Sequence, residues 1–559
     1  MHCRSMSLLI RRLSSPFVSS PSLLHFRLAF LSLPPMATSS KPTDESLLPY
    51  DALPNDQDLD SIIADAKFTA DIRTDFYDRS LASRRNALVG VACSSIFSCS
   101  CIVAGIVTLA NHGVFGVNVT NIPAVSEGVN PLPLEGEILS LALNLIVTLC
   151  TESIGLAHGI SLRSALASES RLRFNTNLRL LTAARGWCNP NGVLFNGISA
   201  VLLIISYTSA SLVVCPNYSL TYQNLAIAGI SLLVLGIALL LQVMIALSGM
   251  RAVKILTWSS SPFDLTAALV HHTQLTPATF RCMRCVSDLD AFGGPAKPSD
   301  IQPSAWHAHP NIRKVVIFLW VIVAACAGWA ALSTYIQRKD YANMGALMWS
   351  FLPNMQSSYI AYDLPGVNFG EVWILLLVNM AVIQGSLTLG LHCSELIANV
   401  IRDETQWRSA TGRKGLRTAT NSILTHPICL VLFATKPFLH WIFGLSFSVH
   451  DVASDGTLRI SYIVMYTAQI WNLCIALFIF ASFFTFVALR RPRGPQPAAY
   501  GHLQTLANLV DEWSPVMWWG HKEDGIPYCH AGTSDHPLPD VKMDCVYAGC
   551  DTGSLIPLS

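Results

Sequence analysis

Residues 136–158 read GEILSLALNLIVTLCTESIGLAH, and residues 371–393 read EVWILLLVNMAVIQGSLTLGLHC. Both segments are 23 residues long and mostly apolar. A helix needs about 20 apolar residues to cross the hydrocarbon core of a bilayer. The two segments therefore predict transmembrane helices, and each is the second member of a set of four such segments.

The composition is that of a membrane protein. Of the 559 residues, 52% are hydrophobic and 13% are charged, and the mean hydropathy is +0.44. These values exclude an ordinary soluble domain. The predicted fold is an all-α, polytopic helical bundle with about eight spans. The spans are predicted at 87–110, 136–158, 192–214, 223–247, 314–332, 371–393, 427–449 and 461–489.

The spacing of the spans predicts a 4+4 pseudo-repeat. In each set of four, two long connections are followed by a short one, and the middle connection is basic. The seventh span is the least apolar in pattern, because Lys436 and His440 interrupt it. If it were re-entrant, the two ends of the chain would lie on opposite sides of the membrane.

The positive charges predict the orientation. The loops after spans 2, 4 and 6 each carry at least five Lys and Arg residues, whereas the opposite loops carry 0, 0, 2 and 1. Basic loops stay in the cytoplasm, so both termini are predicted to be cytoplasmic. Two N-glycosylation sequons, at Asn118 and Asn217, fall in loops predicted to lie outside.

The expected organisation has five parts. They are a disordered cytoplasmic arm (1–86), the first four-span half (87–248), a basic cytoplasmic loop (249–313), the second half (314–489) and a cytoplasmic tail (490–559). At the start of the arm, residues 1–35 contain four Arg and no acidic residue. This composition suggests a targeting peptide, a disordered tail, or an extension upstream of a true start at Met36.

The repeat is also visible in the residues that leave spans 2 and 6. A histidine at the predicted membrane border, His158 or His392, precedes a Glu-[Ser/Thr]-x-[Leu/Trp]-Arg motif, at Glu169–Arg173 or Glu404–Arg408. Glu and Arg four residues apart share a helix face. We therefore expect a helix to continue out of each span.

Four segments carry a resemblance to known sequences. They are ESRLRFNTNLRLLT (169–182), LGLHCSELIANVIRDETQWR (389–408), KPFLHWIFGLSFSV (436–449) and the tail from AAYGHLQTLANLVDEW (498–513) onward. Together they resemble a family of uncharacterised multi-pass membrane proteins of mushroom-forming fungi (basidiomycetes). The resemblance implies membrane residence, and the family has no established activity to transfer.

Polar residues inside the spans are the candidate functional residues. A charge at the centre of a bilayer costs about 2.5–3.5 kcal/mol on insertion scales. Glu152 and Lys436 are predicted at similar depth, so they could meet. Helical spacing groups other polar residues into stripes that face the bundle interior. The full candidate set is Asn144, Thr148, Glu152, Gln384, Thr388, His392, Lys436 and His440.

Two interpretations of these residues remain open. In one, they line a solute or proton path, with Glu152 as the titratable group and Lys436 as its counter-charge. In the other, they hydrogen-bond between helices while Lys436 extends to the headgroups. The sequence favours a non-enzymatic membrane scaffold or sensor, with a small-solute or ion transporter as the alternative.

The parts outside the spans contain no recognisable catalytic motif and predict no cofactor. Cys282 and Cys285 are weak metal-ligand candidates, because no nearby histidine has the spacing of a zinc module. In the tail, an amphipathic helix is predicted by the helical spacing of Leu503, Leu506, Val510 and Trp513. Because Trp518 and Trp519 follow at once, we expect this segment to lie on the membrane surface or under the bundle.

The expected partners are the lipid bilayer and a protein that could bind the cytoplasmic loops and tail. A nucleic-acid partner is not expected, because no basic soluble domain is present. The plasma membrane or an endomembrane is favoured over a mitochondrial membrane.

Overall fold

The computed structural model describes residues 81–113, 116–123, 134–179, 181–218, 222–288, 294–340, 349–353, 357–363, 369–418, 426–454 and 458–548. The predicted targeting segment and most of the N-terminal arm lie outside these residues. All helices and strands below belong to one compact unit.

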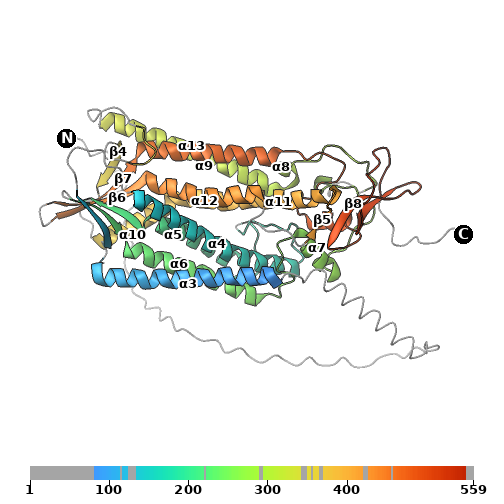
Figure 1. Ribbon diagram of the computed structural model, residues 1–559, viewed down its shortest axis with the longest axis horizontal. Helices are drawn as coiled ribbons and strands as arrows, with labels where there is room; N and C mark the ends of the chain where they lie inside the picture. The colour runs from blue at the N-terminus through green and yellow to red at the C-terminus, as the bar shows by residue number, and fades with distance from the viewer. Residues whose placement is uncertain are drawn as a thin grey trace, which may run out of the picture. The chain divides into compact units, whose positions relative to one another are not determined.

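The described part of the chain contains eight helices that are long and apolar enough to cross a membrane, which confirms the predicted all-α polytopic bundle (Figure 1). The seventh, α12, is a continuous helix despite Pro437. The helices are α3 (Leu81–His112), α4 (Leu134–Ser168), α5 (Val193–Ser211), α6 (Gly229–Ala252), α9 (Pro310–Asp340), α10 (Phe369–Cys393), α12 (Pro427–Ser446) and α13 (Thr467–Leu489).

Two three-stranded antiparallel sheets lie at one end of the bundle, called here the hairpin end. The first has the order β1-β3-β2 and the second β4-β7-β6. In each sheet, the strand after the first helix of a half pairs with the hairpin between the third and fourth helices. The strands are β1 (Val117–Pro123), β2 (Val214–Tyr218), β3 (Tyr222–Ile227), β4 (Tyr359–Asp363), β6 (Phe447–Ser454) and β7 (Leu458–Tyr466).

These strands correct the predicted limits of four spans. The spans were predicted to include residues 214, 223–227, 447–449 and 461–466, but these residues belong to β2, β3, β6 and β7. Each strand adjoins a helix, and the strand residues next to that helix are mostly apolar. A hydropathy pattern cannot divide such a run into strand and helix.

Several helix contacts of the first half (α3 to α6) have counterparts in the second half (α9 to α13), although the extensive contact of α4 with α6 has no comparable counterpart between α10 and α13. Within the halves, α3 packs against α6 and α9 against α13. Between the halves, α4 packs against α12 and α5 against α10, while β2 lies beside β6. If a two-fold axis related two parallel repeats, it would superimpose the α4–α12 contact on the α5–α10 contact. The pseudo-repeat stays a prediction, and this pattern is the one it would produce.

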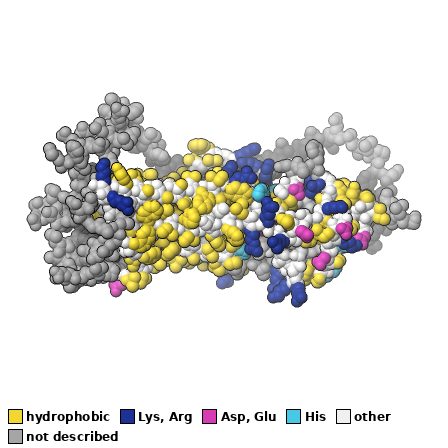
Figure 2. All heavy atoms as spheres, turned by 90° about the horizontal axis from the view of Figure 1, so that it is seen from above, with side chains coloured by type: hydrophobic (Ala, Val, Ile, Leu, Met, Phe, Trp, Pro, Cys, Tyr) yellow, Lys and Arg dark blue, Asp and Glu magenta, His cyan; other side chains and the backbone are white. Residues whose placement is uncertain are grey.

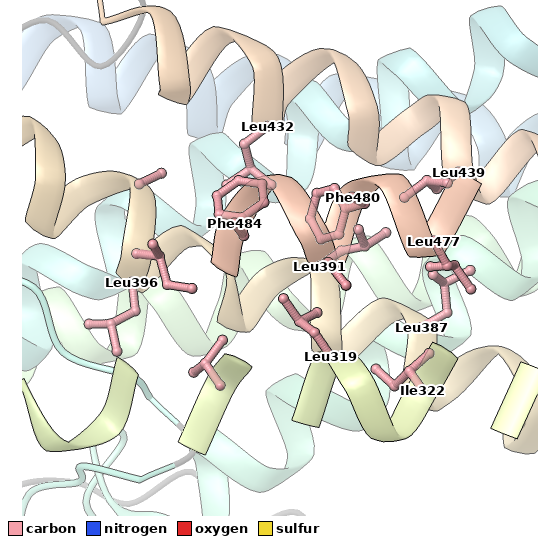
Figure 3. Packing of buried hydrophobic residues seen from close by; sticks show 14 of the residues in the cluster. Leu319, Ile322, Leu387, Leu391, Leu396, Leu432, Leu439, Leu477, Phe480 and Phe484 are labelled. Carbon is pink, nitrogen blue, oxygen red and sulfur yellow. The ribbon is translucent and has the colours of Figure 1, made fainter. Parts of the chain in front are cut away.

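Apolar side chains fill the second half and coat the outside of the bundle. Leu319 of α9, Leu391 of α10 and Phe484 of α13 belong to the buried cluster in Figure 3. Apolar side chains form a belt over the middle of the bundle (Figure 2), and many large apolar residues of the spans are exposed. On the face shown, most Lys and Arg side chains lie at or beyond one border of this belt.

Beyond that border lies the basic end, which carries helices α7 (Pro262–His271), α8 (Ala305–Ala308), α11 (Glu395–Arg408) and α14 (Leu503–Leu509). It also carries strands β5 (Leu416–Arg417), β8 (Val516–Glu523) and β9 (His530–Ser534), joined in the order β5-β8-β9. The predicted tail helix is α14, but it ends at Leu509, and Trp518 and Trp519 lie in β8.

The tail packs against α11 at the basic end. Trp407 of α11 is 1% exposed, shares a buried cluster with Phe263 and Leu506, and donates a hydrogen bond to the carbonyl of Pro497 (2.7 Å). Glu404 accepts hydrogen bonds from the backbone N–H groups of Ala499 and Tyr500. The tail is therefore a docked part of the fold.

The two Glu/Arg motifs after spans 2 and 6 differ in structure. Glu404 and Arg408 form the expected i,i+4 ion pair on α11, at 2.8 Å. After span 2 the helix continues past His158 as expected, but it ends at Ser168, before the Glu169–Arg173 motif, and Ser170 has a left-handed φ of 55°. Glu169 pairs with Arg171 instead of a residue one helical turn away.

Two buried histidines hold the basic end together. The ring of Phe174 lies 4.1 Å from that of His309 and 4.8 Å from that of His502. Nδ1 of His309 accepts the N–H of Asn311, and Nδ1 of His502 accepts the N–H of Thr505 at the start of α14. Burial lowers the pKa of each imidazole to about 4. Both rings are therefore neutral at pH 7.

Candidate functional site

Lys436 of α12 lies at the centre of a charged cluster between the two halves. Its ammonium group forms ion pairs with Glu152 of α4 and with Glu395, the first residue of α11. His392 of α10 joins them, with Nδ1 2.7 Å from Oε1 of Glu395 and 3.5 Å from Nζ of Lys436. Because the side chain of Lys436 is only 1% exposed, the expectation that it extends to the headgroups is wrong.

Local interruptions of two helices position the cluster. Ser394 forms a turn between α10 and α11, and its hydroxyl donates to the carbonyl of Gly390 (2.8 Å). Pro437, directly after Lys436, lacks the N–H that would continue the hydrogen bonding of α12. Lys436 and Glu395 therefore lie next to interruptions in the helical hydrogen bonding, whereas Glu152 comes from the regular helix α4.

A second group of polar side chains lies one helical turn closer to the hairpin end. The rings of Tyr207 and His440 are stacked, with centroids 3.9 Å apart and planes inclined by 13°. Gln384 lies 2.9 Å from Nδ1 of His440, and the hydroxyl of Tyr207 lies 3.1 Å from those of Thr148 and Thr151. Tyr207, His440 and Gln384 are each 0% exposed, so this stacked layer closes the interior toward the hairpin end.

The structure brings together six of the eight predicted intramembrane residues. Glu152, His392 and Lys436 form the charged cluster, and Thr148, Gln384 and His440 belong to the stacked layer. Asn144 and Thr388 are buried, but their side chains donate only to backbone carbonyls of their own helices, those of Ser140 and Gln384.

The sequence interpretation missed Glu395, Tyr207 and Arg179. Glu395 lies two residues beyond the predicted end of span 6 and was treated as lying outside the membrane. Its position three residues after His392 could have revealed it. Tyr207 had no visible signal, because a tyrosine in an apolar span is usually core.

Two cavities flank the charged cluster on its basic-end side. The larger, about 170 Å³, lies between α4 and α12 and is lined by Glu152, Glu395 and Lys436 among others. The smaller, about 90 Å³, lies between α5 and α10. Arg179, Glu395 and Asn399 line both cavities. The side chains of Glu152 and Glu395 remain 30% and 25% exposed, so the carboxylates are accessible while their lysine is not.

Arginines line the basic-end part of the larger cavity. Arg402 of α11 forms an ion pair with Asp403 at 3.0 Å, and Asn175 donates to the other oxygen of the same carboxylate. Arg163 of α4 donates to Asn175 at 2.7 Å. Arg179 lies against Gly155, where an added Cβ would come within 2.7 Å of its Nη2 atom.

The charged cluster has the ligand types of a metal site, but a lysine already occupies its centre. Ligand atoms of Glu152, His392 and Glu395 all lie within 4.8 Å of one another. Nζ of Lys436 contacts both carboxylates and approaches the imidazole. The ammonium group therefore supplies the cation that these ligands would otherwise attract.

The remaining sequence candidates lie away from this site. Cys282 is buried, Cys285 lies 3.0 Å from Asp288, and within the described residues neither belongs to a group of three or more metal-ligand side chains. Asn118 and Asn217 belong to β1 and β2 at the hairpin end.

Comparison of the chain with protein-family models, with curated proteins and with solved structures found no match.

Proposed function

We propose that the protein is a small-solute or ion transporter whose binding site is the larger cavity. One observation carries this proposal. In the interior of a membrane bundle, two carboxylates and a lysine line a cavity, and both carboxylates keep a quarter or more of their surface accessible. Ionisable groups are costly inside a membrane and commonly mark a solute or ion path.

The arrangement of the halves supports this proposal. Alternating access requires a site near the interface of two units that opens to one side at a time. The stacked layer of Tyr207, His440 and Gln384 closes the interior toward the hairpin end, while loop residues 175–179 border the cavity at the basic end. A rocking motion of one half against the other would open the opposite side.

The orientation belongs to the proposal. The Lys and Arg side chains at the border of the apolar belt favour a cytoplasmic basic end (Figure 2). The cavity would then face the cytoplasm, in the plasma membrane or an endomembrane.

A non-transporting scaffold or sensor is the second candidate, and the docked tail favours it. The tail forms a buried core with α7 and α11, so a partner bound there could influence the bundle. This function needs no accessible charge within the membrane, which is why we place it second. For neither function do we expect enzymatic chemistry.

The proposal can be tested with the full chain in liposomes. Charge movement is recorded on solid-supported membranes after concentration jumps of sodium phosphate, sodium succinate, glycine, choline chloride and potassium chloride, and after a pH jump. We expect a current with at least one of these, abolished in Glu152→Gln. The matched control is Glu135→Gln, on the same helix but exposed and outside the cavity.

Two results would contradict transport. One is the lack of a current with all of these jumps, together with the lack of tracer uptake of the same solutes. The other is a current that Glu152→Gln leaves unchanged.

A further inference from the structure

The larger cavity has an excess of positive charge. Its immediate surroundings hold four permanent cations against three carboxylates. Glu152 and Glu395 share Lys436, so one negative charge is left over on that side. On the other side, Asp403 is paired with Arg402, while Arg163 and Arg179 add two positive charges. The balance at the arginine-lined part therefore favours an anion.

Several hydrogen-bond donors of the cavity wall are unused. Nη1 of Arg402 is buried and has no hydrogen-bond partner, and Arg402 as a whole is only 4% exposed. Among the described residues, neither the guanidinium of Arg179 nor the side chain of Asn399 has a hydrogen-bond partner. Only Nη1 of Arg402 is a buried donor left without an acceptor, which is unfavourable. Arg179 and Asn399 are half-buried and line the cavity. Together these donors point to a ligand that would accept their hydrogen bonds.

The positions of these donors converge on one space. Asn399 and Arg402 are three residues apart on α11 and share a helix face. Arg179 approaches from the opposite wall, where Gly155 of α4 leaves room for its guanidinium. All three residues line the larger cavity. A guanidinium presents N–H groups in a planar fork that matches the oxygens of a phosphate or carboxylate.

We infer that the larger cavity binds a small oxyanion, a phosphate or carboxylate group, through Arg179, Arg402 and Asn399. The inference rests on the proposed function, for which it names the solute class. A cavity of about 170 Å³ is smaller than the roughly 300–1,000 Å³ of sites for drug-sized ligands, so the solute is small. The same chemistry would accept the headgroup of an anionic lipid.

The first arm of the test measures soluble anions. The full chain is placed in nanodiscs of phosphatidylcholine, and equilibrium binding of radiolabelled inorganic phosphate and succinate is measured, with choline as the cationic probe. We expect saturable binding of at least one anion and none of choline. Arg179→Gln should weaken binding by about 10- to 100-fold, because it removes a charge-assisted hydrogen bond.

The variants are chosen so that loss of fold does not mimic loss of binding. Among the residues that the structure describes, Arg179 forms no ion pair, so its replacement strands no partner charge. Arg171→Gln is the matched control, because Arg171 is exposed in the same loop, pairs with Glu169 and lies outside both cavities. It should leave the affinity unchanged within about twofold. Asn399→Ala should weaken binding by about 2- to 10-fold, as expected for one neutral hydrogen bond.

The second arm identifies a lipid source. Nanodiscs containing phosphatidylglycerol are compared with phosphatidylcholine alone, and native mass spectrometry counts the lipids retained. One phosphatidylglycerol held by the wild type and lost in Arg179→Gln, without binding of soluble anions, would support the oxyanion site and assign it to a headgroup.

Other outcomes would overturn the inference. These are the absence of binding by both soluble anions and phosphatidylglycerol, or binding that Arg179→Gln does not weaken. Binding and flux are separate measurements, so the two proposals can fail independently. Anion binding without any flux would remove only the transport proposal, and flux of a cation without anion binding would remove only this inference.

Discussion

Replacement of Lys436 by methionine is the perturbation that probes the charged cluster most directly. Methionine has a similar length and no charge, so Lys436→Met leaves Glu152 and Glu395 facing each other. Their ligand oxygens lie within 4.8 Å. At an effective dielectric constant of about 20, two like charges at that separation repel each other by about 3.5 kcal/mol. Breaking a buried ion pair by removing one partner typically costs 3–5 kcal/mol.

We therefore expect Lys436→Met to lower the free energy of unfolding by about 3 kcal/mol, the lower end of that range, because both carboxylates are partly exposed. The assay is the loss of folded protein in detergent with rising temperature, followed by fluorescence-detected size exclusion. Glu152→Gln alone should be milder, since Lys436 keeps its pair with Glu395.

The double variant tests whether the lost stability comes from repulsion between the two unpaired carboxylates. Lys436→Met with Glu152→Gln leaves a single carboxylate in the cluster, so most of the lost stability should return. The reasoning is refuted if Lys436→Met unfolds at the wild-type temperature, or if adding Glu152→Gln lowers the unfolding temperature further.

Three other predictions concern the basic end and the charged cluster. Because the pKa of His309 and of His502 is lowered to about 4 from 6.5, each contributes stability that is present above pH 6.5 and lost as the pH falls toward 4. The loss between pH 7 and pH 5 is about 2 kcal/mol for each histidine. Urea unfolding at pH 7 and pH 5 should show this loss in the free energy of unfolding. His502→Asn, which keeps an N-cap side chain on α14, should make the loss smaller. Lys436→Ala should create a Co²⁺ or Zn²⁺ site from the two carboxylates and His392; a visible Co²⁺ absorption in this variant and not in the wild type would establish it, and its absence would contradict the geometry. Trp407→Ala should destabilise the basic end by about 3–5 kcal/mol, so limited proteolysis should release the tail; a tail as resistant as in the wild type would contradict its docking through this residue.

The positions of the helices could be predicted from the sequence because bilayer thickness sets a length that hydropathy detects. Glu152 and Lys436 could be expected to meet because their distances from the predicted ends of their spans place them at similar depth. Only the three-dimensional arrangement could show that Lys436 is shared with Glu395, since a turn at Ser394 brings that residue back into the cluster.

Other features lay beyond the reach of sequence patterns. The parts of β3, β6 and β7 that adjoin helices are mostly apolar, so hydropathy does not separate them from the helices. The helix expected across Glu169–Arg173 fails at Ser170, whose left-handed conformation is rare for a residue other than glycine. The docked tail depends on contacts with α11 that only the fold brings together.

The counterpart contacts of the two halves have a consequence for stoichiometry. If the halves descend from one unit, that unit would have assembled as a symmetric pair with two identical cavities. Here the cavity between α4 and α12 is about 170 Å³ and its counterpart between α5 and α10 about 90 Å³, and the lysine lies on α12 alone. The two halves of a single chain can differ in sequence, so their two sites can differ, whereas identical subunits form identical sites. The expected ratio is therefore one solute per chain, with a binding curve of Hill coefficient one.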